Sequence, residues 1–364
     1  MKSVHRTFSG GFRRLIFFLG GLLLLPGLLS CGAPMEISSP TTTPTRIASR
    51  TPTATVTQTP TPTLTPTPTE PTVLCGGPTE MFILLVGSDA RQDSYSVGLA
   101  DSVRIMRLDF IHGTIQMLAF PRDLYVEIPQ IADHNGITHG KLNQAFLYGN
   151  PGYDYYDGPG QGPGLLALTL ESNFGARVDH YIAVNLQTFV RIIDTLGGID
   201  IDLPYVIDGR VKGSRDPNRY FPAGEQHLDG YRTMLLARLR PQGDFRRAEV
   251  QSLILEAIAQ KTLSPGVIVK LLKLIETFDD SVQTDLGPVE IGQLLCMRNK
   301  FRTQDIEFLS FPEDLFESAR VRDRVLGNTS ILDADFEVLA EYVKRFNDGL
   351  WGQPREHLRE EIEP

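Results

Sequence analysis

The chain has 364 residues, of which 41% are hydrophobic and 22% are charged, and its formal net charge is −9. This length suits one large domain or two small ones, and the composition is that of a globular protein. The acidic balance, with neither a basic tail nor a run rich in lysine and arginine, argues against nucleic acid as a partner.

The first 30 residues have the pattern of an export signal. A basic segment containing Arg13 and Arg14 precedes an apolar segment at 15–29, which has signal-peptide length and is short for a full membrane span. Residues 28–32 read Leu-Leu-Ser-Cys-Gly and resemble a bacterial lipobox, with Cys31 as the lipidated residue. An uncleaved signal anchor is the alternative. Both predict a chain outside the cytoplasm and tethered to the cytoplasmic membrane.

The next segment, 31–76, is predicted to be a linker. Threonine and proline dominate it, with repeats such as Thr-Pro-Thr-Pro-Thr at 59–63. Because it has almost nothing to bury, it cannot offset the loss of chain entropy and should stay unpacked. Proline favours extended polyproline II, so this stalk could reach on the order of 100 Å.

From Met81 onward the pattern is mixed α/β. Predicted strands lie at 82–86, 103–110, 115–120, 180–184, 199–203 and 306–311. Predicted helices lie at 165–174, 186–196, from 228 to Arg238, and at 246–261, 289–300 and 333–347. The glycine- and tyrosine-rich segment 131–164 is interpreted as a mobile wall or lid of a cleft. Alternation of this kind predicts a central sheet covered by helices on both faces.

Two cysteines remain if Cys31 is acylated. Cys75 lies where the stalk meets the domain, and Cys296 lies in a late predicted helix. Oxidising surroundings make a disulfide between them possible, and two buried thiols are the alternative. Two isolated cysteines are too few for a closed metal site, which needs about four ligands.

Charged side chains gather where predicted strands end. Asp89 and Arg91 follow the first strand, Asp101 precedes the second, and Arg122 and Asp123 follow the third. Carboxylates hold hard cations and guanidinium groups hold phosphoryl oxygens, so these residues indicate a metal-bound phosphate. Salt bridges between strand ends are the alternative.

A second polar cluster lies downstream. Arg238 and Arg240 alternate with Leu239, and Arg247 and Gln251 are four residues apart, so they share one face of a helix. Arginine near the start of a helix is unfavourable unless an anion is close. This cluster therefore also indicates a bound phosphate. The alternative is a basic helix start that is exposed to solvent and paired with neighbouring acidic residues, because it would show the same spacing.

Eight short segments, including Leu-Val-Gly-Ser-Asp-Ala-Arg and Phe-Pro-Arg-Asp, add a more specific signal. They lie at 83–91, 100–102, 120–123, 141–143, 197–202, 228–230, 237–240 and 244–247. In content and order they resemble the LytR–CpsA–Psr family, from Met81 to Lys261 and more weakly to about Leu315. The resemblance implies a three-layer α/β/α sandwich with a central mixed sheet and an apolar groove for a polyprenyl chain.

The same resemblance implies an activity and a division of the chain. Such proteins transfer a glycopolymer from an undecaprenyl-phosphate or undecaprenyl-pyrophosphate carrier to peptidoglycan, outside the cytoplasm and with Mg²⁺. The predicted parts are a signal peptide or anchor at 1–30, the linker at 31–76, a catalytic domain at 77–315, and a C-terminal helix with a charged tail at 316–364.

Carried over residue by residue, the resemblance implies that Asp89 and Asp101 bind Mg²⁺ and are catalytic, with either one as the base. Catalytic arginines would be Arg122 and Arg240. Further substrate-binding groups would be Lys141, Arg238, Arg247 and Gln251, with Arg91 and Asp123 in support.

The sequence departs from the family pattern at two positions. Leu99 and Val250 stand where the family often has arginine. Arg104 and Arg246 are nearby cations, but each is predicted on the wrong side of its element. With fewer cations, less of the phosphate charge is neutralised, so two functions remain as alternatives to the transferase. One is a non-catalytic binder of polyprenyl-phosphate-linked glycans, and the other is a polyprenyl-pyrophosphate hydrolase in which water replaces the acceptor.

Overall fold

The structure is a computed structural model, and it describes residues 72–90, 95–212, 214–240, 243–262, 266, 282–300 and 305–351. These residues belong to one compact unit. The predicted signal, the linker up to residue 71, Cys31 and Arg91 lie outside the described residues. Within the described part, no helix is both long and apolar enough to cross a membrane.

A six-stranded mixed sheet forms the centre of this unit. Its strands are β1 (Glu80–Ser88), β2 (Ala100–Asp109), β3 (Thr114–Phe120), β6 (His180–Asn185), β11 (Val282–Thr284) and β12 (Ile306–Ser310). The order is β11-β6-β1-β2-β3-β12. β1 pairs antiparallel with β2 and parallel with β6, while β3 pairs antiparallel with β2 and parallel with β12. The end of β1, the start of β2 and the end of β3 therefore lie along one edge.

The central strands are buried on both faces, which is why they read as continuous apolar runs. Phe82, Leu84 and Val86 pack into one core cluster, whereas Met81 and Ile83 pack into another on the opposite face. A turn at 111–113 joins β2 to β3, and Gly113 there has φ 69°, a conformation that favours glycine.

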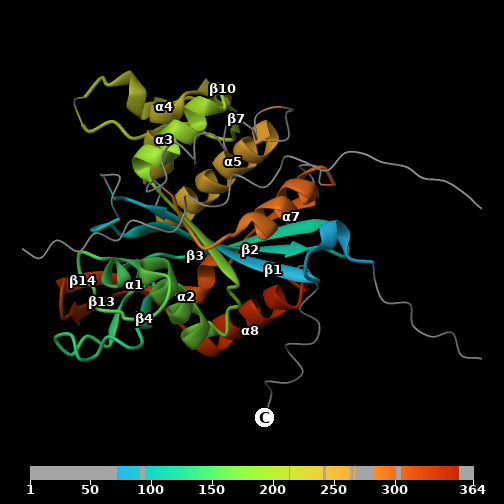
Figure 1. Cartoon of the computed structure of the whole chain (residues 1–364). Coiled ribbons are helices and arrows are strands. Elements are labelled where there is room, and N and C mark those ends of the chain that lie inside the picture. Colours follow the sequence, from blue (N-terminus) through green and yellow to red (C-terminus); the bar gives the residue numbers. More distant parts are fainter. Residues whose placement is uncertain are drawn as a thin grey trace, which may run out of the picture. The chain divides into compact units, whose positions relative to one another are not determined.

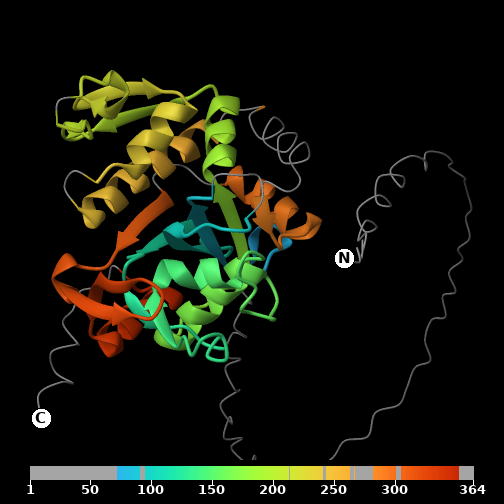
Figure 2. The ribbon, with the colours of Figure 1, turned by 90° about the vertical axis from the view of Figure 1, so that its left-hand side faces the viewer.

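Helices cover both faces of the sheet. They are α1 (Leu142–Gly149), α2 (Gln161–Phe174), α3 (Leu186–Thr195), α4 (Gly230–Arg238), α5 (Asp244–Thr262), α7 (Pro288–Arg298) and α8 (Phe336–Asn347). Figure 1 shows α1, α2 and α8 on one side and α3, α4, α5 and α7 on the other, and the perpendicular view in Figure 2 agrees. The predicted three-layer α/β/α sandwich with a mixed sheet is confirmed.

Shorter strands complete the unit. They are β4 (Tyr125–Glu127), β5 (His139–Lys141), β7 (Ile199–Leu203), β8 (Ile207–Asp208), β9 (Tyr220–Phe221), β10 (Gly224–Leu228), β13 (Phe316–Asp323) and β14 (Gly327–Ala334). β7 and β10 share a separate apolar cluster with α3, α4 and α5. The β13–β14 hairpin was not predicted, and because β14 runs to Ala334, the last helix begins later than expected. Val343 and Phe346 of α8 pack into the main core.

The segment 131–164 differs from its interpretation as a wall or lid. It contains β5, α1 and the start of α2. Tyr148 is fully buried and accepts a hydrogen bond from Gln144 Nε2 at 2.8 Å, and a Cβ on Gly162 would meet the Phe146 carbonyl oxygen at 2.6 Å. Glycine at such a position allows close packing of backbone, so α1 and the start of α2 belong to the core, while other residues of the segment are exposed.

Cys75 and Cys296 form a disulfide, with an Sγ–Sγ distance of 2.03 Å and a Cα–Cα distance of 5.8 Å. The bond links the short 3₁₀ turn η1 (Leu74–Gly76), just before β1, to α7. Of the two alternatives that the sequence left open, the structure has the disulfide. It ties the start of the compact unit to a late helix.

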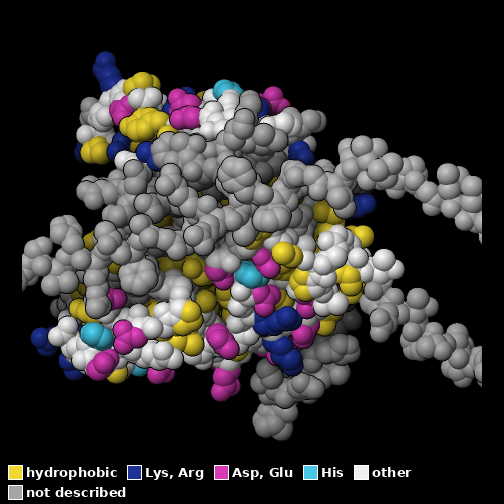
Figure 3. All heavy atoms as spheres, viewed as in Figure 1, with side chains coloured by type: hydrophobic (Ala, Val, Ile, Leu, Met, Phe, Trp, Pro, Cys, Tyr) yellow, Lys and Arg dark blue, Asp and Glu magenta, His cyan; other side chains and the backbone are white. Residues whose placement is uncertain are grey.

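The described surface in Figure 3 carries charges of both signs. Acidic and basic side chains lie next to one another on this face. Among the described residues, some acidic and basic side chains pair, as Arg177 Nη1 does with Glu80 Oε2 at 3.0 Å. A phosphorylated ligand would therefore be recognised by a local cluster of cations rather than by the general charge of this face.

Candidate phosphate-binding groove

A groove lies between the sheet and helices α3, α4 and α5. Its cavity volume is about 220 Å³, and one part of its wall is apolar. The apolar lining includes Leu85, Ile182, Val184, Phe189, Met234 and Leu255. At the strand ends it meets a smaller cavity of about 40 Å³. Both cavities are lined by Asp101, Ser102, Arg104, Arg247 and Gln251. The groove therefore joins an apolar channel to a polar end.

A β-bulge shapes the polar end. Gly87 pairs with Ser102 whereas Ser88 pairs with Ala100, so Asp101 is an extra residue in β2. Just beyond β1, Asp89 Oδ1 accepts a hydrogen bond from the Leu99 N–H at 2.7 Å, and the Asp89 N–H donates to the Leu99 carbonyl at 3.1 Å. Asp89 thus fixes the approach to β2, next to the bulge that holds Asp101.

Four predicted site residues form a chain of ion pairs along the strand ends. Arg122 pairs with Asp101 through Nη1, and its Nε lies 3.3 Å from Asp123 Oδ2. Lys141 Nζ lies 2.9 Å from Asp123 Oδ1. Each of these side chains is at most 21% exposed. Partial burial weakens solvent screening, so these charges act on one another and on a bound anion more strongly than surface charges would.

The pKa of Asp123 records this surrounding charge. Burial alone would raise that pKa, but the hydrogen bond from Lys141 and the charges of Arg122, Lys141 and Arg240 outweigh burial and lower it. Asp123 is therefore ionised at neutral pH and positions cations. Arg240, which follows α4, thus acts electrostatically on Asp123 at the strand ends.

The second predicted cluster approaches from α4 and α5. Arg247 is buried, and its Nη2 donates to the Asp101 carbonyl oxygen at 3.5 Å. Gln251, one turn later in α5, donates from Nε2 to the Ala237 carbonyl at 3.2 Å and so ties α5 to α4. Arg238 lines the groove at the end of α4, and Arg240 is exposed. Both clusters thus meet at the polar end.

One expectation about the arginines is wrong. Strand alternation from Asp101 predicts Arg104 on the opposite face, but Arg104 lines both cavities with Asp101. The bulge is the reason, because an extra residue shifts the alternation by one position. Arg246 lies at the surface and pairs with Glu249 Oε2 at 2.9 Å.

Mg²⁺ is the cation that the resemblance implies for the acids at the strand ends. Among the described residues, no group of three or more His, Cys, Asp and Glu side chains could hold a metal ion. Mg²⁺ usually takes only one or two carboxylates and completes its shell with water and substrate phosphates. Asp101 lines both cavities and could supply one such carboxylate, whereas Asp89, at the adjacent end of β1, lines neither cavity.

Comparisons with known proteins agree with this architecture. The chain is 29% identical over 231 residues to the polyisoprenyl-teichoic acid–peptidoglycan teichoic acid transferase TagV of Bacillus subtilis (strain 168), covering 63% of this chain and 55% of that protein. The chain thus spans just over half the length of that relative. It is 27% identical over 237 residues to the regulatory protein MsrR of Staphylococcus aureus (strain COL), covering 63% of this chain and 64% of MsrR.

The crystal structure of B. subtilis TagV superimposes with a TM-score of 0.56 at 27% identity, covering 76% of this chain and 99% of that one. The profile of the LytR_cpsA_psr family matches residues 53–346, which include part of the predicted linker and all but the last residue of α8; the resemblance in sequence alone had left both out. Because this match covers most of the sequence, the chain belongs to the LytR–CpsA–Psr family.

Proposed function

We propose that this protein transfers a glycopolymer from a polyprenyl-phosphate or polyprenyl-pyrophosphate carrier to peptidoglycan, outside the cytoplasm. The observation that carries the proposal is the groove, whose apolar wall leads to Asp101, Arg247 and Gln251. A polyprenyl phosphate matches these two parts of the groove, since its long apolar chain ends in a charged head. Family membership and the name of the relative TagV support the same reaction class.

The charge distribution suits phosphoryl transfer. With a pyrophosphate carrier, the acceptor hydroxyl would attack the phosphoryl group that carries the glycan, and polyprenyl phosphate would leave with the electrons of the broken P–O bond. Arg247, Arg240 and Arg122 would stabilise the charge that develops on the phosphoryl oxygens. The hydroxyl proton would pass to Asp89 or Asp101, the acids at the strand ends.

Mg²⁺, which Asp89 and Asp101 would hold together with substrate phosphates, would neutralise phosphate charge. Lys141 and Asp123 would position another residue rather than act on the substrate directly. Lys141 pairs with Asp123, and Asp123 holds Arg122 beside Asp101. The protein would therefore supply a preorganised set of cations more than a proton relay.

The lipobox-like segment around Cys31 and the stalk before residue 72 complete the proposal. A domain anchored to the membrane by a lipid or a signal segment, on an extended stalk, could reach a donor in the membrane and an acceptor in the wall. This part rests on the sequence pattern alone.

The test is a reconstitution with magnesium, lipid-linked glycan and peptidoglycan. We expect covalent transfer of the glycan to peptidoglycan. Release of free glycan without an acceptor would indicate the hydrolase, and binding without turnover would indicate the non-catalytic binder.

A conservative variant sharpens this test. Arg240→Lys keeps the charge but loses the planar guanidinium fork, so transfer should fall by roughly tenfold or more. Arg177→Lys is the matched control, because Arg177 pairs with Glu80 Oε2 at 3.0 Å, lies over the Phe82 ring and does not line the groove.

A further inference from the structure

Arg104 is a buried arginine in the wall of the groove. It lies in the middle of β2, paired with Leu85 of β1 and Ala119 of β3, and is 2% exposed. Its Nη2 donates to the Ala248 carbonyl of α5 at 2.8 Å. Within the described residues, its Nε and Nη1 are buried and have no hydrogen-bond partner. Two donors of one guanidinium are thus left unused.

Such an arrangement is costly for the protein without a ligand. Burial lowers the pKa of Arg104 to about 10, so the side chain is still charged at neutral pH. A buried charge normally has both an ionic partner and saturated hydrogen bonds, because desolvation is not otherwise offset. The neutral carbonyl of Ala248 satisfies only one of the guanidinium nitrogens.

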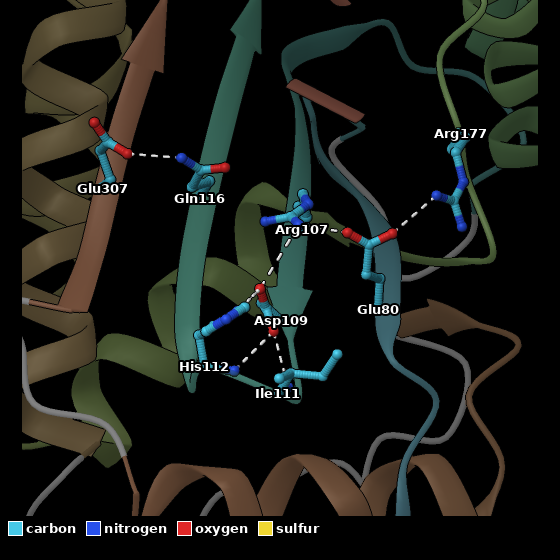
Figure 4. Close-up of polar contacts among 8 residues, drawn as sticks. All are labelled: Glu80, Arg107, Asp109, Ile111, His112, Gln116, Arg177 and Glu307. Atoms are coloured by element: carbon cyan, nitrogen blue, oxygen red, sulfur yellow. Dashed lines mark hydrogen bonds and ion pairs between the residues drawn. The ribbon is translucent and has the colours of Figure 1, made fainter. Parts of the chain in front are cut away.

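Arg107, three residues later in the same strand, is a direct comparison. It is also buried, but its guanidinium pairs with Glu80 and lies 3.7 Å from Asp109 Oδ2. Figure 4 shows Arg107 between these two carboxylates. Glu80 in turn pairs with Arg177, and Asp109 contacts His112. The fold thus provides acids for Arg107, whereas Arg104 faces a groove.

We propose that Arg104 is a substrate-binding residue that donates from Nε and Nη1 to phosphoryl oxygens of the lipid carrier at the inner end of the polar site. This inference rests on the proposed function, and it extends the site from the strand ends to the middle of β2. Arg104 lines both cavities with Asp101, Arg247 and Gln251, so an anion held there also meets Arg247. The Ala248 hydrogen bond holds the guanidinium against α5 before the ligand arrives.

The test compares binding with stability in the full chain. Calorimetry with magnesium measures the Kd for geranylgeranyl pyrophosphate and for inorganic pyrophosphate, and thermal unfolding is followed without ligand. Arg104→Met should weaken binding of geranylgeranyl pyrophosphate by about tenfold or more. Its Tm without ligand should stay the same or rise, because an unpaired buried charge is removed.

Arg107→Met is the matched control. It removes a buried guanidinium that has acidic partners, so it should lower the Tm and leave both Kd values unchanged. Arg104→Gln keeps an N–H donor for Ala248 without the charge, and it replaces Arg104→Met if that variant does not fold. Arg104→Gln should show the same loss of affinity.

Three outcomes overturn the inference. One is wild-type affinity for geranylgeranyl pyrophosphate in Arg104→Met or Arg104→Gln. The second is a lower Tm with unchanged Kd values, which would make Arg104 a structural residue. The third is weaker binding of inorganic pyrophosphate with unchanged binding of geranylgeranyl pyrophosphate, which would indicate a site for free phosphates. If the wild type binds neither compound, the proposed function and the role of Arg104 both fail. If the wild type and the Arg104 variants all bind tightly, only the role of Arg104 is refuted.

Discussion

Removal of the Cys75–Cys296 disulfide should destabilise the domain strongly. The bond joins residues 221 positions apart. Loop-closure entropy for a loop of this length corresponds to about 5 kcal/mol of unfolding free energy, near the upper end of what native disulfides contribute. The linked segments also pack together, since Leu74, Cys75 and Met297 share one apolar cluster. The groove residues belong to other segments, so the loss should appear in stability before it appears in the site.

Urea unfolding of the double variant Cys75→Ser/Cys296→Ser measures this loss. With a slope of about 2–3 kcal/mol per molar urea, 5 kcal/mol corresponds to a midpoint lower by about 2 M. Wild type treated with a reducing agent should unfold like the double variant, and the reducing agent should not affect the variant further. Two titratable thiols in the native wild type, or a midpoint shift below about 0.3 M, would refute the reasoning.

Three further predictions concern the site and the anchor. Asp101→Asn should lower transfer by roughly a hundredfold while the circular dichroism spectrum stays native, and near-normal transfer would remove Asp101 from the mechanism. The lowered pKa of Asp123 implies stability that is present above the unfolded pKa of about 3.9 and is lost as the pH falls through the lower folded value. Asp123→Asn should therefore be less stable than wild type at pH 5–8, with the difference closing as the pH falls below about 3.9, and a difference independent of pH would contradict this. Radiolabelled palmitate should enter wild type but not Cys31→Ala, whereas an unlabelled, uncleaved wild type would favour the signal anchor.

The layers of the fold could be predicted because burial leaves a strong pattern in sequence. β1 and β3 are apolar along most of their length, and α3 keeps its apolar residues at helical spacing. The β13–β14 hairpin gave no such signal. Its strands are largely exposed and carry alternating charges, as in Glu317, Arg320 and Arg322, so a half-buried two-stranded ribbon reads as loop.

The glycine-rich segment 131–164 was interpreted as a mobile wall or lid because its glycines suggest a loop. Glycine can permit a loop to move, and it can also permit two backbones to pack closely. The sequence gives the position of each glycine but not the atoms that lie close to it in space. Gly162 and Gly164 have backbone atoms within 2.6 Å of where a Cβ would stand, so here glycine serves packing.

The location of the site was readable because three strand termini lie along one edge. Antiparallel pairing brings the end of β1, the start of β2 and the end of β3 together, so charged residues that are far apart in sequence become neighbours. The orientation of Arg104 could not be read in this way. It depends on one unpaired residue, Asp101, and a bulge of one residue reverses the face on which every later side chain of the strand lies.

That reversal has an energetic consequence for the whole groove. Arg104 and Arg247 are both buried at its polar end, next to apolar side chains of the sheet and α5. Among the described residues, Nε and Nη1 of Arg104 have no hydrogen-bond partner, and a purely apolar ligand would leave these two donors unused. A free phosphate would compensate them without filling the apolar wall. A molecule with an anionic head and a long apolar tail would satisfy both parts, so the proposed specificity for a lipid-linked phosphate would follow from the cost of leaving either part unoccupied.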